Sequence, residues 1–144
     1  MSTWPGSDCT GTLQGARISL EQIQYNGGRI LEPIELAHVI VDAIAERFGS
    51  DVIMLDMRDV SLLADYFIIC NAESTPQFKA ILDQVENQAK AAGGHRRRVE
   101  GEPNSGWVLL DYGAVVVHIF DPELRAYYNL EELWKQARLV VHIQ

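Results

Sequence analysis

The chain has 144 residues, of which 47% are hydrophobic and 22% are charged, and its formal net charge is −8 at pH 7. This length and composition suit one globular domain that buries a core of its own. The negative charge argues against bulk attraction to nucleic acid or to an anionic membrane and favours a basic partner, and no apolar run is long enough to span a bilayer.

The N-terminal segment is rich in Gly, Ser, Thr and Gln, and its apolar residues follow no sustained period. We expect a flexible extension over residues 1–31, a domain over residues 32–138 and a C-terminal tail over residues 139–144. The first residues lack the basic and apolar regions of a signal peptide, and the two cysteines lack the spacing of a zinc site. We therefore expect a cytoplasmic protein in a reducing compartment.

The first half of the domain combines helical periodicity with short runs rich in β-forming residues. The predicted elements are a helix over residues 33–48, a strand over 52–57, a helical turn over 60–64, a strand over 66–71 and a helix over 74–92. Pro33 suits the first turn of a helix, and Ser74 suits the cap of the next one. Gly49 and Gly93 follow the two helices as stop signals.

The second half of the domain contains a hairpin and then short helices. The predicted elements are a strand over residues 95–100, a turn over 101–106, strands over 107–112 and 115–120, a helix over 122–127 and a helical turn over 130–134. Gly113 and Ala114 supply the tight turn of the hairpin, and Asp121 caps the helix that follows. Residues 139–143 alternate too little to choose between an edge strand and a frayed end. The element order predicts an α/β fold, a mixed β-sheet flanked by helices.

Carboxylates near the ends of predicted strands are the first candidates for chemistry in an α/β fold. They are Asp56, Asp59, Asp65, Asp111 and Asp121. A magnesium site for nucleotidyl transfer needs two carboxylates on one strand face and a phosphate-binding loop. Asp56 and Asp59 do not have that spacing, and no glycine-rich loop precedes a helix. We therefore favour capping and turn roles for these residues and expect no metal and no cofactor.

Two residues inside predicted strands are candidates for a base or a nucleophile. His118 lies in the apolar run VVVHIF, where we expect an inward-facing side chain with a hydrogen-bond partner. Asp111 could approach it across the hairpin. Cys70 has no histidine or positive charge nearby in sequence, so we interpret it as a small apolar strand residue. Neither pattern indicates an enzyme.

The remaining signals concern binding. The run Arg96–Arg98 is the longest basic stretch and could contact rRNA, although a solvated polar surface is the simpler interpretation. Aromatic residues gather in one C-terminal segment: Trp107, Tyr112, Phe120, Tyr127, Tyr128 and Trp134. Tyrosine and tryptophan are typical anchors of interfaces, and nearby acids such as Asp111 suit a basic protein partner.

The segment GWVLLDYGAVVVHIFDPELRAYYNLEELW, residues Gly106–Trp134, resembles the signature of the Iojap family, the ribosomal silencing factors. LLADYFIICNAEST (Leu62–Thr75) and VEGEPNSGW (Val99–Trp107) resemble its other blocks, so the match runs from about Pro33 to Trp134. The resemblance implies a nucleotidyltransferase-like fold without the catalytic carboxylates. It implies a homodimer that binds the fourteenth protein of the large ribosomal subunit. Such binding blocks the small subunit sterically and lowers translation when nutrients are scarce.

The resemblance also implies a partner-binding surface that includes Trp107, Asp111 and Tyr112. It also reaches Tyr128, Leu130 and Trp134, for which a role in the core or in a dimer contact is the alternative. Family members usually carry an aspartate where this chain has Ala114. Two alternative functions stay open: a large-subunit assembly factor that uses the same contact, and a residual nucleotidyltransferase or nucleotide-binding protein.

Overall fold

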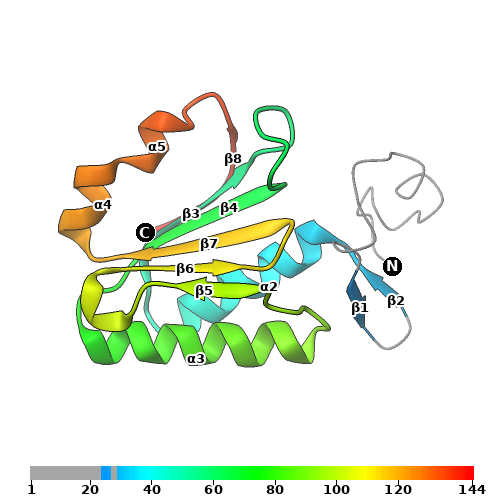
Figure 1. Cartoon of the computed structure of the whole chain (residues 1–144), viewed down its shortest axis with the longest axis horizontal. Helices are drawn as coiled ribbons and strands as arrows, with labels where there is room; N and C mark the ends of the chain where they lie inside the picture. The colour runs from blue at the N-terminus through cyan, green and yellow to red at the C-terminus, as the bar shows by residue number, and fades with distance from the viewer. Residues whose placement is uncertain (1–23, 27–28) are drawn as a thin grey trace.

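The computed structural model of the chain describes residues 24–26 and 29–144. Most of the extension expected over residues 1–31 lies outside the described residues. Its described part forms a small antiparallel hairpin, β1 (Gln24–Asn26) and β2 (Arg29–Leu31), which stands apart from the main sheet in Figure 1.

Six strands form the central sheet, in the order β5-β6-β7-β4-β3-β8. The strands are β3 (Ser50–Asp56), β4 (Tyr66–Asn71), β5 (Arg98–Glu100), β6 (Trp107–Asp111), β7 (Val115–Phe120) and β8 (Arg138–Ile143). The pairing of β4 with β7 is parallel and the other pairings are antiparallel. The predicted mixed sheet flanked by helices is therefore confirmed.

Helices lie on both sides of this sheet (Figure 1). They are α2 (Pro33–Glu46), α3 (Thr75–Ala91), α4 (Pro122–Tyr128) and α5 (Leu130–Leu133), and a 3₁₀ turn, η3 (Pro103–Ser105), precedes β6. The predicted caps are confirmed, because the side chain of Ser74 accepts from Gln77 N at 3.2 Å and Asp121 accepts from Leu124 N at 2.8 Å. None of the helices in the described part of the chain is long and apolar enough to cross a bilayer.

The main core lies between the sheet and the helices α2 and α3. Both helices turn an apolar stripe toward the sheet, and their fully buried residues include Ile40, Ile44, Ile81 and Val85. Cys70 lies in this core, where burial raises the pKa of its thiol to about 12. The thiol is protonated at neutral pH, which agrees with the prediction of an apolar strand residue.

Several predicted boundaries differ from the structure by a few residues. The helix expected to reach Phe48 ends at Glu46, and Phe48 takes the left-handed φ of 63° that glycine usually supplies after a helix. The turn expected over residues 60–64 comes earlier, since Met57 O accepts from the amides of Val60 and Ser61. The last residues form β8, which pairs with β3 at the edge of the sheet. Of the two alternatives for these residues, the edge strand is therefore the one observed, and residues 139–143 lie in the sheet rather than in the separate tail expected over residues 139–144.

Candidate functional site

The sheet face opposite α2 and α3 is only partly covered. Strand register places Phe67, Trp107, Leu109, Asp111 and Val116 on this face, because Val116 pairs with both Phe67 and Asp111 and residues two apart in a strand share a face. All five side chains are partly exposed. We call these five residues the open face.

The helices α4 and α5 cover the rest of the same side. A second apolar cluster lies beneath them, with buried side chains from β3, β4 and β7 such as Ile53, Ile69 and Phe120. Leu124, Leu130 and further side chains pack against this cluster from the helices and their connections. The open face thus adjoins this second apolar cluster and is the part of the same side that the helices leave uncovered.

Charged residues border the open face at β5. Arg98 pairs with Asp111 and Glu100 pairs with Leu109 in the register, so both side chains lie on this side of the sheet. Arg98 Nε lies 3.3 Å from a Glu100 carboxylate oxygen and 3.5 Å from one of Asp111. Asp111 also accepts from Gly113 N at 2.7 Å. Two carboxylates around one guanidinium leave this border with a net negative charge.

Aromatic rings pack where the open face meets α4. Trp107 stacks on Phe120, with ring centroids 4.9 Å apart and an angle of 25°, and Tyr128 of α4 lies 4.7 Å from Trp107. Such contacts hold large rings in place at little further cost in conformational entropy. The cluster joins strand β6 to α4 and sets the position of Trp107.

His118 lies beneath this cluster and bonds to Trp107 rather than to Asp111. Trp107 Nε1 donates to His118 Nδ1 at 3.3 Å, so the predicted inward-facing histidine with a hydrogen-bond partner is confirmed. The partner is Trp107, whereas Asp111 lies opposite Val116 in the register. His118 is 5% exposed, and burial lowers the pKa of its imidazole to about 4. The imidazole is therefore neutral at neutral pH.

Tyr112 is predicted to contact the partner, but the structure places its side chain in the core. Its side chain is 1% exposed and belongs to the core beneath α2 and α3, on the face opposite Trp107. Burial raises the pKa of its hydroxyl to about 12. The strand alternation that turns Trp107 and Asp111 outward turns Tyr112 inward. A partner that docks on this fold does not reach it.

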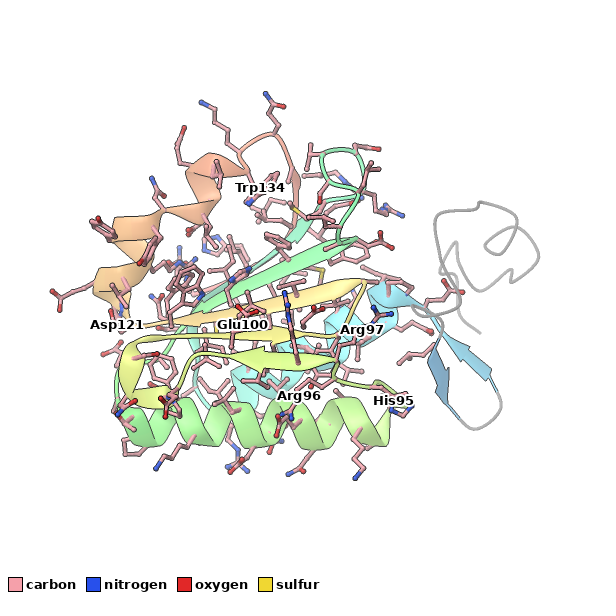
Figure 2. All side chains as sticks on the ribbon, viewed as in Figure 1. His95, Arg96, Arg97, Glu100, Asp121 and Trp134 are labelled. Carbon is pink, nitrogen blue, oxygen red and sulfur yellow. The ribbon has the colours of Figure 1, made fainter. Side chains whose placement is uncertain are left out.

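The other three predicted contact residues lie on the same side of the sheet as the open face, in α4, in α5 and directly after α5. Tyr128 is 46% exposed and remains available at the border of the open face. Leu130 and Trp134 pack against the second apolar cluster, and the Trp134 ring meets Phe67 edge-on with centroids 5.9 Å apart. Figure 2 shows Trp134 on the same side of the sheet as α5, far from the helix α3. The core role that the sequence left open for Leu130 and Trp134 therefore fits the packing.

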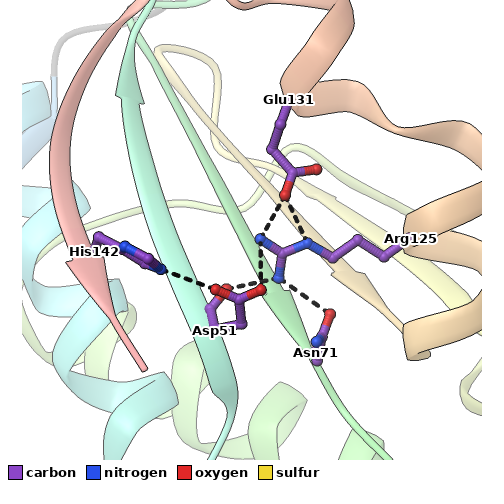
Figure 3. A network of polar contacts seen from close by, with 5 residues as sticks. All are labelled: Asp51, Asn71, Arg125, Glu131 and His142. Carbon is purple, nitrogen blue, oxygen red and sulfur yellow. Dashed lines mark hydrogen bonds and ion pairs between the residues drawn. The ribbon is translucent and has the colours of Figure 1, made fainter.

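A buried arginine ties α4 and α5 to the sheet (Figure 3). Arg125 is 6% exposed and donates from Nε and Nη2 to one oxygen of Glu131, at 2.9 and 2.7 Å. Its Nη1 donates to the backbone oxygen of Asp51 at 2.6 Å and to Asn71 Oδ1 at 3.0 Å. Asp51 in turn contacts His142 Nε2 of β8 at 2.9 Å. One guanidinium thus joins β3, β4 and both short helices.

Three of the five carboxylates considered for catalysis have structural partners, namely Asp56, Asp111 and Asp121. Asp111 and Asp121 accept from backbone amides of a turn and a helix start, which confirms the predicted capping roles. Burial alone raises the pKa of Asp56, but hydrogen bonds from Arg58 and Arg138 outweigh it and hold the pKa well below its usual range. Among the described residues no three His, Cys, Asp or Glu side chains lie together as a metal site requires.

Two arginines of the basic run form ion pairs within the chain. Arg96 pairs with Glu86 of α3, and Arg98 lies between Glu100 and Asp111. Figure 2 shows His95 and Arg96 beside α3, on the opposite side of the sheet from Trp134. Contact of this run with rRNA stays a prediction.

Sequence reasoning missed three members of the open face and two polar centres. They are Phe67, Leu109, Val116, His118 as the partner of Trp107, and Arg125. The register of the hairpin could have found Leu109 and Val116, because residues two apart in a strand, and the residues that pair with them, share one face. Phe67 depends in addition on the parallel pairing of β4 with β7, which the hairpin does not predict. Burial of Arg125 depends on contacts 54 and 74 residues away in sequence, which no local pattern shows.

Comparison with known proteins gives consistent matches. A family model described as "Ribosomal silencing factor during starvation" matches residues 31–144. The Ribosomal silencing factor RsfS of Halalkalibacterium halodurans is 42% identical over 106 residues, covering 74% of this chain and 91% of that protein. A crystal structure of a Chromobacterium violaceum protein superposes with a TM-score of 0.70 at 34% identity, covering 73% of this chain and 88% of the other. A mouse protein named "Mitochondrial assembly of ribosomal large subunit protein 1" is 26% identical over 99 residues, 67% of this chain and 43% of its own length.

Proposed function

This chain belongs to the family of ribosomal silencing factors, and from that premise we propose that it binds the large ribosomal subunit and keeps the small subunit from joining. We place the contact on the open face and its target on the fourteenth protein of the large subunit. Steric exclusion needs no turnover, so the proposal includes no catalytic residue and no cofactor. Its consequence is lower translation when nutrients are scarce.

The open face is the observation that carries this proposal. Phe67, Leu109 and Val116 are apolar side chains that share one strand face and stay partly exposed, and Trp107 lies beside them. Contiguous exposed apolar surface on a folded domain often marks a protein-binding site. Tryptophan held in place by packed rings is the kind of residue that dominates binding energy. The face therefore supports docking of a protein partner.

Charge supports a basic partner. The chain carries a net charge of −8, Asp111 belongs to the open face, and Glu100 lies at its border. Complementary charge speeds the approach of a partner and fixes its orientation. Ribosomal proteins are mostly basic, so a large-subunit protein fits this border better than an acidic partner would.

Sedimentation tests the mechanism in two steps. The purified chain is mixed with isolated large subunits and centrifuged, and small subunits are then added to the complex. We expect the chain to pellet with large subunits and to reduce the peak of joined ribosomes. Free chain left in the supernatant contradicts binding, and a normal joined peak in the presence of bound chain contradicts steric exclusion.

A role in assembly of the large subunit is a second candidate, favoured by the name of the mouse relative. The same surface would then act on immature particles. A strain that lacks this protein distinguishes the two roles on a sucrose gradient. Accumulated immature large subunits in growing cells support assembly, whereas excess joined ribosomes in starved cells support silencing.

A further inference from the structure

His118 differs from Glu32, Asp56 and Arg125, the other buried acidic and basic side chains in the described part of the chain. Glu32 takes part in the capping box of α2, Asp56 binds two arginines and Arg125 binds Glu131. Among the described residues, His118 has one hydrogen bond, to Trp107, and its buried Nε2 has no partner. A buried polar group without a partner lowers stability, so packing alone does not account for this histidine.

The bond to Trp107 fixes how protons are placed on the imidazole. An indole Nε1 can only donate, so His118 Nδ1 must accept and must lack a proton. A neutral imidazole then carries its proton on Nε2, which is the nitrogen without a partner. Every neutral state that keeps the Trp107 bond therefore leaves a buried N–H donor unused.

The same bond fixes the orientation of the indole. Phe120 stacks on the Trp107 ring and Tyr128 packs against it, and these contacts hold the ring plane. They do not choose which edge of the ring faces inward. The hydrogen bond makes that choice, because it turns the N–H edge toward His118. With its N–H bonded to His118, the rest of the Trp107 indole offers a partner ring carbon and no donor, which suits an aliphatic stem or a cation of a basic partner.

We infer that His118 is a positioning residue, which holds the Trp107 indole in the orientation that the large-subunit partner recognises. This inference rests on the proposed function, since it assumes that Trp107 contacts that partner. The buried, unpartnered Nε2 is the cost of this arrangement. Replacing His118 with an apolar residue should therefore maintain or raise stability while it weakens binding.

A matched pair of variants separates the hydrogen bond from packing. His118→Asn places an amide oxygen near the position of Nδ1. His118→Leu introduces a side chain of almost the same shape as asparagine, but without a hydrogen-bond acceptor. His118→Phe, which keeps the ring volume, is a second variant without an acceptor. We measure the dissociation constant for isolated large subunits, and the Trp107 indole N–H signal by ¹⁵N NMR, assigned with Trp107→Phe.

We expect His118→Leu and His118→Phe to bind large subunits about tenfold more weakly, because the hydrogen bond that orients the Trp107 indole is lost. We expect His118→Asn to stay within about threefold of the parent chain. The Trp107 indole signal should shift in the Leu and Phe variants, and its hydrogen should exchange faster with solvent.

Two results overturn the inference. One is parent-like binding by the Leu and Phe variants, and the other is equal loss of binding by the Asn, Leu and Phe variants. Failure of the proposed function looks different, because Trp107→Ala would then bind large subunits as tightly as the parent chain does. If only one of the two acceptor-free variants folds, that variant against His118→Asn still decides the question.

Discussion

The two faces of the sheet differ most clearly along strand β6. Val108, Leu110 and Tyr112 point toward α2 and α3 and are at most 1% exposed, whereas Trp107 and Leu109 point the other way and stay partly exposed. Neighbouring residues in one strand thus belong to two surfaces with different roles. The helix-covered face holds the fold together, and the open face is available to a partner. Substitutions on the two faces should therefore separate stability from binding.

Tyr112→Ala should have the largest effect on stability. It removes a large, fully buried ring from the core, and truncations of this kind cost about 3–5 kcal/mol. Urea denaturation followed by circular dichroism measures the change in the free energy of unfolding. A variant that is as stable as the parent chain but fails to bind large subunits would support a contact role for Tyr112. That result would contradict the division between a stabilising face and a binding face.

Acid should destabilise the protein through His118. The pKa of His118 is lowered from 6.5 to about 4 in the folded state, so the unfolded chain binds a proton first as the pH falls. The free energy of unfolding should therefore fall by about 3 kcal/mol between pH 6.5 and pH 4, and should not change through this group above pH 6.5. Urea titrations across that range measure the slope. His118→Leu should remove this part of the slope, and an unchanged slope would contradict the burial of a neutral imidazole.

Arg125→Leu should lower the free energy of unfolding by about 2 kcal/mol. The loss stays moderate because Glu131 and Asp51 are partly exposed and can be hydrated again. Arg96→Leu breaks an exposed pair with Glu86 and serves as the control, with an expected loss below about 1 kcal/mol. Equal losses in the two variants would show that the Arg125 network does not hold α4 and α5 on the sheet.

Leu109→Ala should have the smallest effect on stability and a clear effect on binding. Leu109 is partly exposed on the open face, so its truncation should cost less than about 1 kcal/mol, against about 2–5 kcal/mol for the buried neighbour Leu110→Ala. Thermal unfolding and large-subunit sedimentation of both variants check the pair. Parent-like binding by Leu109→Ala would restrict the contact to the region around Trp107.

Local sequence signals predicted most of the fold. The strand Tyr66–Asn71 and the start of α3 at Thr75 follow from a β-rich run and from the Ser74–Pro76 start signal, which depend on adjacent residues. The sequence does not decide whether residues 139–143 form a strand, because the β3 residues that pair with β8 lie more than 80 residues away in sequence. Pairing with a distant strand decides its structure, and its own residues alternate too little to predict it.

The candidate site was predicted only in part, and the reason lies in strand β6. WVLLDY is apolar at most positions, so polarity does not show which of its two faces is open. The sequence located the aromatic segment, but it did not separate Trp107 from Tyr112. Only the placement of α2 and α3 on one side, and of the short helices on part of the other, makes that separation.

The dissociation constant of Trp107→Ala for isolated large subunits tests the open face most directly. Phe48→Ala is the matched control, because Phe48 is an aromatic residue that is 84% exposed and lies outside the open face. We predict that Trp107→Ala, folded by circular dichroism, binds at least about thirtyfold more weakly, as expected for an interface anchor worth about 2 kcal/mol. Phe48→Ala should bind as the parent chain does. Parent-like binding by folded Trp107→Ala would contradict the assignment of the open face as the ribosome-binding surface.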